Sequence, residues 1–199
     1  MALNRITRGG PARRALSLVA VAALVTVAFA ACGSGGSTTT TVSDKAGDAE
    51  ILNNVLAREL AAIRAYERTI PLLRGPALRT AREFRADEQE HVNAVVKALR
   101  GLGEKATPEE EEIESEGLKT RADALGFLYE VESVSIANGL RAISHLTAPW
   151  PRSLLGSIAA NQAQHLVVLR QLLGADSAEL IPEAFEDGTT PAPSEMMAE

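Results

Sequence analysis

Residues 52–66 read LNNVLARELAAIRAY, and this stretch carries the pattern on which the fold prediction rests. Its apolar side chains recur every three or four residues, which is the spacing of one face of an α-helix. Glu59 stands on that same face, between Leu56 and Ile63. A carboxylate on the buried face of a helix needs a partner, because an isolated buried charge is strongly unfavourable. The stretch therefore predicts a core helix with a polar group that something else must satisfy.

Three later segments repeat this periodicity, which predicts an all-α protein. Ser43 or Asp44 is placed to cap the first helix. We expect short turns at 75–76 and 149–151, and an end of the second helix at the glycines 101 and 103. The four predicted helices span residues 45–73, 77–99, 118–146 and 152–173.

The lengths of the connections predict the topology. The first and third connections are short, so each joins an antiparallel pair of helices. Residues 101–117 form a much longer connection, and a helix of about 20 residues is only about 30 Å long. This connection can therefore return along the whole bundle, which predicts a four-helix bundle with one long crossover between helices 2 and 3. The acidic run at 109–112 lies in the crossover and is expected to be a solvated linker.

Every predicted helix has polar side chains on its apolar face, near the middle of its length. Three buried carboxylates and two imidazoles need a counter-charge, which a pair of metal ions would supply. Carboxylate with imidazole suits iron, manganese or zinc, and no thiolate is present to indicate a structural zinc site. The inward polar residues are Glu59, then Glu88 and His91, then Glu132, and finally Gln162 with His165.

These stretches together resemble the ferritin-like superfamily, of the bacterioferritin and rubrerythrin type. Residues 52–66 resemble its first helix, in which a ligating Glu is followed seven residues later by an inward Tyr. Residues 87–91, DEQEH, are similar to its Glu-x-x-His motif. The resemblance implies a ferritin-like bundle with a di-iron carboxylate site. The roles that it implies are a terminal ligand at Glu59, bridging ligands at Glu88 and Glu132, one metal each for His91 and His165, and a relay at Tyr66.

Two positions depart from the family pattern. Gln162 stands where the family has a Glu, and Gly139 stands where an inward Tyr is often found. One hypothesis is therefore a metal protein that oxidises Fe(II) or scavenges oxygen or peroxide. The alternative is a metal-free scaffold or binding protein whose site has decayed at Gln162. His145 lies outside this cluster and is expected at the surface, near a helix end.

The N-terminal segment indicates export and anchoring. Four arginines precede an apolar run at 15–31, and Cys32 follows the small residues Ala30 and Ala31. This order is typical of a lipoprotein signal peptide, with Cys32 as the lipidated residue. We expect a membrane-anchored protein facing the extracytoplasmic side. The predicted organisation is a signal peptide at 1–31, the lipidated Cys and a flexible tether at 32–43, the bundle at 44–181 and a disordered tail at 182–199.

Charge excludes one class of partner. After removal of 1–31 the chain keeps 16 basic and 26 acidic residues, a net charge of −10. A nucleic-acid partner is not expected, because binding a polyanion needs a basic face. Expected partners are the membrane and metal ions. A homodimer is compatible with this fold.

Overall fold

A computed structural model describes residues 44–177, 180, 187–189 and 192. The predicted signal peptide, Cys32 and the tether lie outside the described residues, as does most of the predicted tail. The described part is all-α, which confirms the predicted four-helix bundle. Its helices are α1 (Lys45–Thr69), the single 3-10 turn η1 (Ile70–Leu72), α2 (Gly75–Leu102), α3 (Arg121–His145) and α4 (Pro149–Leu173).

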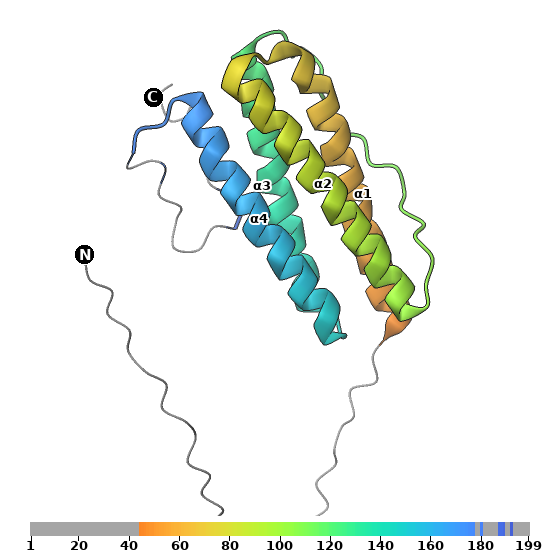
Figure 1. Ribbon diagram of the computed structural model, residues 1–199. Helices are drawn as coiled ribbons and strands as arrows, with labels where there is room; N and C mark the ends of the chain where they lie inside the picture. The colour runs from red at the N-terminus through yellow and green to blue at the C-terminus, as the bar shows by residue number, and fades with distance from the viewer. Residues whose placement is uncertain (1–43, 178–179, 181–186, 190–191, 193–199) are drawn as a thin grey trace, which may run out of the picture. The chain divides into compact units, whose positions relative to one another are not determined.

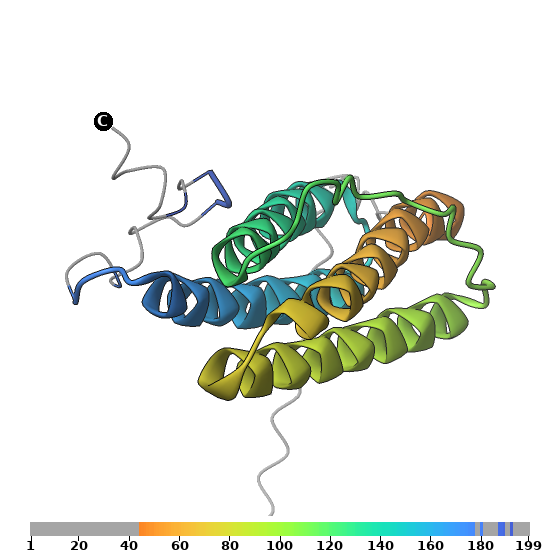
Figure 2. The ribbon, with the colours of Figure 1, turned by 90° about the horizontal axis from the view of Figure 1, so that it is seen from above.

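The helices form two antiparallel hairpins, α1 with α2 and α3 with α4 (Figure 1). The hairpins meet where α1 packs on α3 and α2 packs on α4. Between α2 and α3 the chain runs back along α1 without regular structure, and both views show this crossover (Figures 1 and 2). Arg58 forms an ion pair with Glu111 of the crossover, and Arg64 Nη2 donates to the Glu111 carbonyl at 2.6 Å. The crossover is thus fastened to the first helix, as its predicted length allows.

Two predicted turns are helix starts instead. Gly75 and Pro76 open α2, and Pro149 opens α4, so those predictions were wrong at their boundaries. Proline suits the first turn of a helix because its missing N–H would have no intrahelical partner there. Gly101 lies inside α2, which ends at Gly103 with φ +85°. The left-handed backbone at that position favours glycine and closes the helix.

The first helix begins and the last helix ends where predicted, beside Asp44 and Gly174, whereas α3 begins at Arg121 and not at the predicted residue 118. The Asp44 side chain accepts from the Gly47 N–H and caps α1. Thr120 and Asp123 form a reciprocal capping box at the start of α3. Gly174, with φ +103°, ends α4 where predicted.

A buried aspartate joins the first turn of α1 to the corner between α3 and α4. Asp48 is 1% exposed and accepts from Thr147 N at 2.7 Å and Ala148 N at 2.9 Å. The Thr147 hydroxyl donates to it at 3.1 Å. These bonds hold the corner between α3 and α4 against the first turn of α1.

The apolar core is divided into two clusters. On α2, Phe84 belongs to one cluster and Val92 to the other. On α4, the change falls between Ile158 and Leu166. The polar residues of both helices lie between these positions, so the predicted metal site separates the two apolar clusters.

Part of the C-terminal tail contacts the bundle. Ala192 is 4% exposed and belongs to the cluster that contains Phe84. Gly188 lies so close to α3 that a Cβ there would be 2.0 Å from the Ser133 carbonyl oxygen.

Among the described helices, none is both long and apolar enough to cross a membrane.

Candidate metal centre

The bundle brings all the inward polar residues predicted from sequence into one buried cluster. Each is at most 9% exposed, although whether they hold metal stays a prediction. They face the interior because each follows the apolar stripe of its own helix. The contributions are Glu59 from α1, Glu88 and His91 from α2, Glu132 from α3, and Gln162 and His165 from α4.

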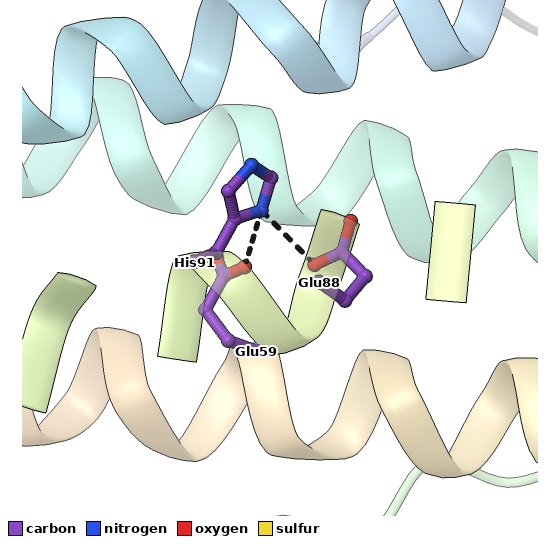
Figure 3. A group of neighbouring side chains, drawn as sticks. All are labelled: Glu59, Glu88 and His91. Atoms are coloured by element: carbon purple, nitrogen blue, oxygen red, sulfur yellow. Dashed lines mark hydrogen bonds and ion pairs between the residues drawn. The ribbon is translucent and has the colours of Figure 1, made fainter. Parts of the chain in front are cut away.

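The first group of potential ligands consists of Glu59, Glu88 and His91 (Figure 3). His91 Nδ1 lies 3.1 Å from Glu59 Oε2 and 3.4 Å from Glu88 Oε2. One ligand atom from each residue lies within 4.8 Å of the others, which is close enough for one ion to contact all three. Glu88 and His91 reach the same point because residues three apart share a helix face.

The second group consists of Glu88, Glu132 and His165. His165 Nδ1 lies 3.0 Å from Glu132 Oε1 and 3.6 Å from Glu88 Oε1. Glu88 therefore belongs to both groups, as a bridging ligand would. Glu132 belongs to the second group alone, and the bridging role that the resemblance implies for it stays a prediction.

Gln162 faces the first group. Its Nε2 donates to Glu59 Oε1 at 3.2 Å, and the side chain is 1% exposed. An amide at this position replaces a negative charge with a hydrogen-bond donor. The cluster thus has three carboxylates, and one of them accepts a hydrogen bond from a neutral amide.

Two buried carboxylate oxygens have no hydrogen-bond partner in the described part of the chain. They are Glu88 Oε1 and Glu132 Oε2, and both residues belong to the second group. Unsatisfied buried polar atoms are rare and usually indicate a missing ion or water. Together with the imidazoles, these oxygens form a donor set that fits iron, manganese or zinc. The residues present therefore fit a metal.

Burial and like charge determine the protonation of the metal-free cluster. Burial first, and then the neighbouring Glu132 carboxylate, raise the pKa of Glu88 well above its ordinary value. Burial lowers the pKa of His91, but hydrogen bonds and attraction from Glu59 and Glu88 outweigh it and raise that pKa to about 10. At neutral pH the metal-free cluster therefore retains protons that a metal would have to displace.

Tyr66 joins the second group from α1. Its hydroxyl donates to Glu132 Oε1 at 2.5 Å, and the side chain is fully buried. Burial and the Glu132 charge raise the pKa of Tyr66 well above its ordinary value. The phenol stays protonated and is coupled directly to the charge on Glu132.

Two contacts at His165 were not predicted from the sequence. His165 Nε2 lies 3.3 Å from Asp87 Oδ2, on the side of the ring away from the cluster. The Phe84 ring stacks on the imidazole, with centroids 3.8 Å apart and an interplanar angle of 19°. A carboxylate behind a ligating histidine fixes its tautomer and orientation. Asp87 immediately precedes the Glu-x-x-His motif, and that adjacency was the available signal.

His145 is exposed in the last turn of α3, as predicted.

Comparison with protein families gave one match, and a search of the curated proteins gave none. The family described as Ferritin-like domain matches residues 47–175. That segment contains every member of the cluster.

Solved structures share the fold at low sequence identity. A ferritin-like, diiron-carboxylate protein from Bacillus anthracis is 20% identical, with a TM-score of 0.56, over 67% of this chain and 100% of that one. A point mutant of Dps1 from Mycobacterium smegmatis is 16% identical with a TM-score of 0.61, over 66% and 99%. Bacterioferritin from Rhodobacter capsulatus, described with a metal-free dinuclear site, is 17% identical with a TM-score of 0.57, over 66% and 86%.

Proposed function

Because the chain belongs to the ferritin-like domain family, we propose that it is a metal-binding protein that uses a di-iron carboxylate site to oxidise Fe(II) or to consume oxygen or peroxide. The observation that carries the proposal is the pair of buried oxygens that have no hydrogen bond in the described part of the chain, Glu88 Oε1 and Glu132 Oε2. A protein that needed only a packed core would have apolar residues there, since they cost less to bury.

The side chains divide the work within this site. Glu59 and His91 would hold one ion, Glu132 and His165 the other, with Glu88 shared. Iron would supply the one-electron chemistry with oxygen species. The Tyr66 hydroxyl would stabilise negative charge on Glu132, and Asp87 would hold the His165 ring in place. The two apolar clusters keep bulk water from both ends of the site.

The proposal includes a location at the outer face of a membrane. Its support is the order of the N-terminal signals: basic residues, an apolar run at 15–31, Cys32 and a Gly/Ser/Thr-rich tether. Lipid on Cys32 would hold the bundle by a tether of about a dozen residues. Radiolabelled fatty acid should be incorporated into the natural chain and not into Cys32→Ser.

The second candidate is a metal-free scaffold or binding lipoprotein. The Gln162 amide favours it, because its hydrogen bond to Glu59 satisfies a carboxylate without a cation. Such a protein would keep the bundle and use its surface.

Metal stoichiometry distinguishes the two candidates. The full chain is loaded with Fe(II) without oxygen, and bound iron per chain is measured after desalting. We expect about two ions per chain, lost in the double variant Glu88→Ala, His91→Ala. Glu90→Ala is the matched control, since Glu90 is exposed on the same helix and should leave the stoichiometry unchanged. Iron near zero in the natural chain would overturn the di-iron proposal and favour the scaffold.

A further inference from the structure

A pocket of about 510 Å³ opens between α1 and α3, beneath the crossover, and ends beside the metal cluster. Glu59 and Gln162 line its inner end. Val55, Leu155 and Ile158 provide apolar walls. This volume lies in the range of pockets that hold small organic molecules.

Gly139 leaves part of this space open. A Cβ built at Gly139 would have no heavy atom within 4 Å, although the residue is half-buried and lines the pocket. A glycine in the middle of a helix costs about 1 kcal/mol relative to alanine. At this position it contributes the room that a larger side chain would fill.

Ser135 provides an unused hydrogen-bonding group in the pocket wall. It is 3% exposed, lines the pocket, and its hydroxyl has no partner in the described part of the chain. Serines inside helices ordinarily bond to the carbonyl one turn back. Ser133 does so with Tyr129 at 2.8 Å, and Ser157 does so with Ser153 at 3.0 Å. The Ser135 hydroxyl is therefore free to bond a guest.

Arg58 provides a second unused donor on the opposite wall. Its Nη2 is paired with Glu111, but its buried Nε also lacks a partner among the described residues. Two unsatisfied donors in one pocket call for an acceptor oxygen, because each costs free energy while unpaired.

Charge around the pocket argues against an ionic guest. Carboxylates of Glu59 and of the crossover residues 109–111 line it, so a bound anion would meet like charge. A simple cation offers no acceptor to the two free donors of Arg58 and Ser135, and the guanidinium groups of Arg58 and Arg141 add like charge. An uncharged guest meets neither penalty.

From these features we infer that the pocket binds a small, uncharged, mainly apolar organic molecule through a carbonyl-type acceptor oxygen, held by Ser135 and Arg58. The guest lies against Glu59 and Gln162, beside the metal cluster. Its binding does not depend on the proposed metal, since every contact named comes from the protein itself.

The test uses 6-propionyl-2-dimethylaminonaphthalene, an uncharged ketone whose fluorescence shifts to shorter wavelength in apolar surroundings. It is titrated into the full metal-free chain. We expect saturable binding of one molecule with a blue shift. Gly139→Leu fills the pocket and should weaken binding at least about tenfold. Ser135→Ala should weaken it about three- to tenfold, without lowering the denaturation midpoint, because the hydroxyl has no bond to lose.

Two controls isolate the site and the chemical class. Gly126→Leu is matched to Gly139→Leu, since Gly126 lies on α3 with open space and outside the pocket lining. It should bind the ketone as the natural chain does. The corresponding naphthoate should bind at least about tenfold more weakly than the ketone. The inference is overturned by absent binding, by equal affinity of the two glycine variants, by an unaffected Ser135→Ala, or by tighter binding of the naphthoate. A failure to load iron leaves all these readouts unchanged, so the two proposals fail separately.

Discussion

Gln162 has the one uncharged side chain at a position where the resemblance implies a carboxylate. Replacing it by Glu would place a fourth carboxylate beside Glu59, which now accepts its amide hydrogen. In the metal-free protein we expect Gln162→Glu to lower the free energy of unfolding by about 1–3 kcal/mol. The reason is that the buried Glu59 carboxylate loses the hydrogen bond from the amide and gains a second carboxylate beside it. With Fe(II) bound the sign should reverse, since the new carboxylate is a ligand. Urea denaturation with and without metal measures both effects.

Gln164→Glu is the matched control for this change. Gln164 is exposed two residues away on α4, so its variant should behave as the natural chain in both conditions. An equal loss of stability in the two variants would show that the Gln162 environment does not distinguish a charge from an amide. Unchanged metal affinity in Gln162→Glu would remove Gln162 from the coordination sphere.

The metal-free cluster should make stability depend on pH. The folded protein raises the pKa of His91 from 6.5 to about 10, and raises that of Glu88 as well. A raised pKa stabilises the fold fully below the unfolded value, and this contribution is lost as pH rises through the folded value. Between pH 6.5 and 10 the metal-free protein should lose up to about 1.4 kcal/mol per pH unit through His91, and the raised pKa of Glu88 acts in the same direction.

Chemical denaturation of the metal-free chain at pH 6.5, 8 and 9.5 tests this prediction. His91→Gln, which removes one titrating group, should flatten the profile. Zinc or iron should flatten it too, because metal binding displaces the protons at neutral pH. A profile that is flat in the natural chain would contradict the raised pKa values.

The residues of the cluster could be predicted individually, but their pairing could not. Glu59 and Glu132 stand on apolar stripes, so periodicity alone placed them inside. The contact of Asp87 with His165 joins α2 to α4 through two residues that are 78 positions apart in sequence. Periodicity within one helix carries no information on such a contact, and for the same reason it did not show that Glu88 alone is shared by both groups.

Helix number and topology were predictable because they follow from periodicity and connection length. The helix ends were less predictable, as the first residues of α2 and α4 show. Pro76 and Pro149 disfavour a helix interior and also favour its first turn, so a proline near a boundary fits either assignment. Gly103 was identifiable because left-handed backbone at a helix end favours glycine.

The Asp48 contacts predict a large effect from a residue outside the buried Glu/His cluster. Asp48→Ala leaves the N–H groups of Thr147 and Ala148 without their acceptor. We expect the free energy of unfolding to fall by about 2–4 kcal/mol, since each buried unsatisfied donor costs about 1–3 kcal/mol. Urea denaturation of the metal-free chain measures it.

Glu50→Ala is the matched control, because Glu50 is exposed in the same part of α1. It should change the free energy of unfolding by less than about 0.5 kcal/mol. If Asp48→Ala were equally mild, water would be replacing the aspartate at the corner, and the corner would be less dry than the 1% exposure of Asp48 indicates.

For the molecule as a whole, Gly188 connects the tail to the bundle. A Cβ at Gly188 would lie 2.0 Å from the Ser133 carbonyl oxygen, so Gly188→Ala should detach this part of the tail from α3. Ala192 would lose its place in the core cluster. We expect at least about fivefold faster proteolysis within residues 182–199, because cleavage follows the population of the opened state.

Gly117→Ala is the matched control for the tail variant. Gly117 has the same φ of +84°, but a Cβ there would meet nothing within 4 Å. Both variants carry the strain of left-handed backbone, about 1–2 kcal/mol, and only Gly188→Ala carries the clash. If the tail were cleaved at the same rate in Gly188→Ala and in Gly117→Ala, backbone strain and not the close approach of Gly188 to α3 would account for the change.

The contacts of the first turn of α1 determine where a mechanical load enters the protein. Any pull on the chain before residue 44 acts first on Asp44, whose N–H donates to the Thr147 hydroxyl at 3.0 Å. Asp48, one turn later, is bonded to the same corner. Tension is therefore shared at once between α1 and the α3–α4 hairpin, and α1 does not have to unwind from its end before the rest resists. A domain held to a surface by its N-terminus would transmit force into both halves of its bundle together.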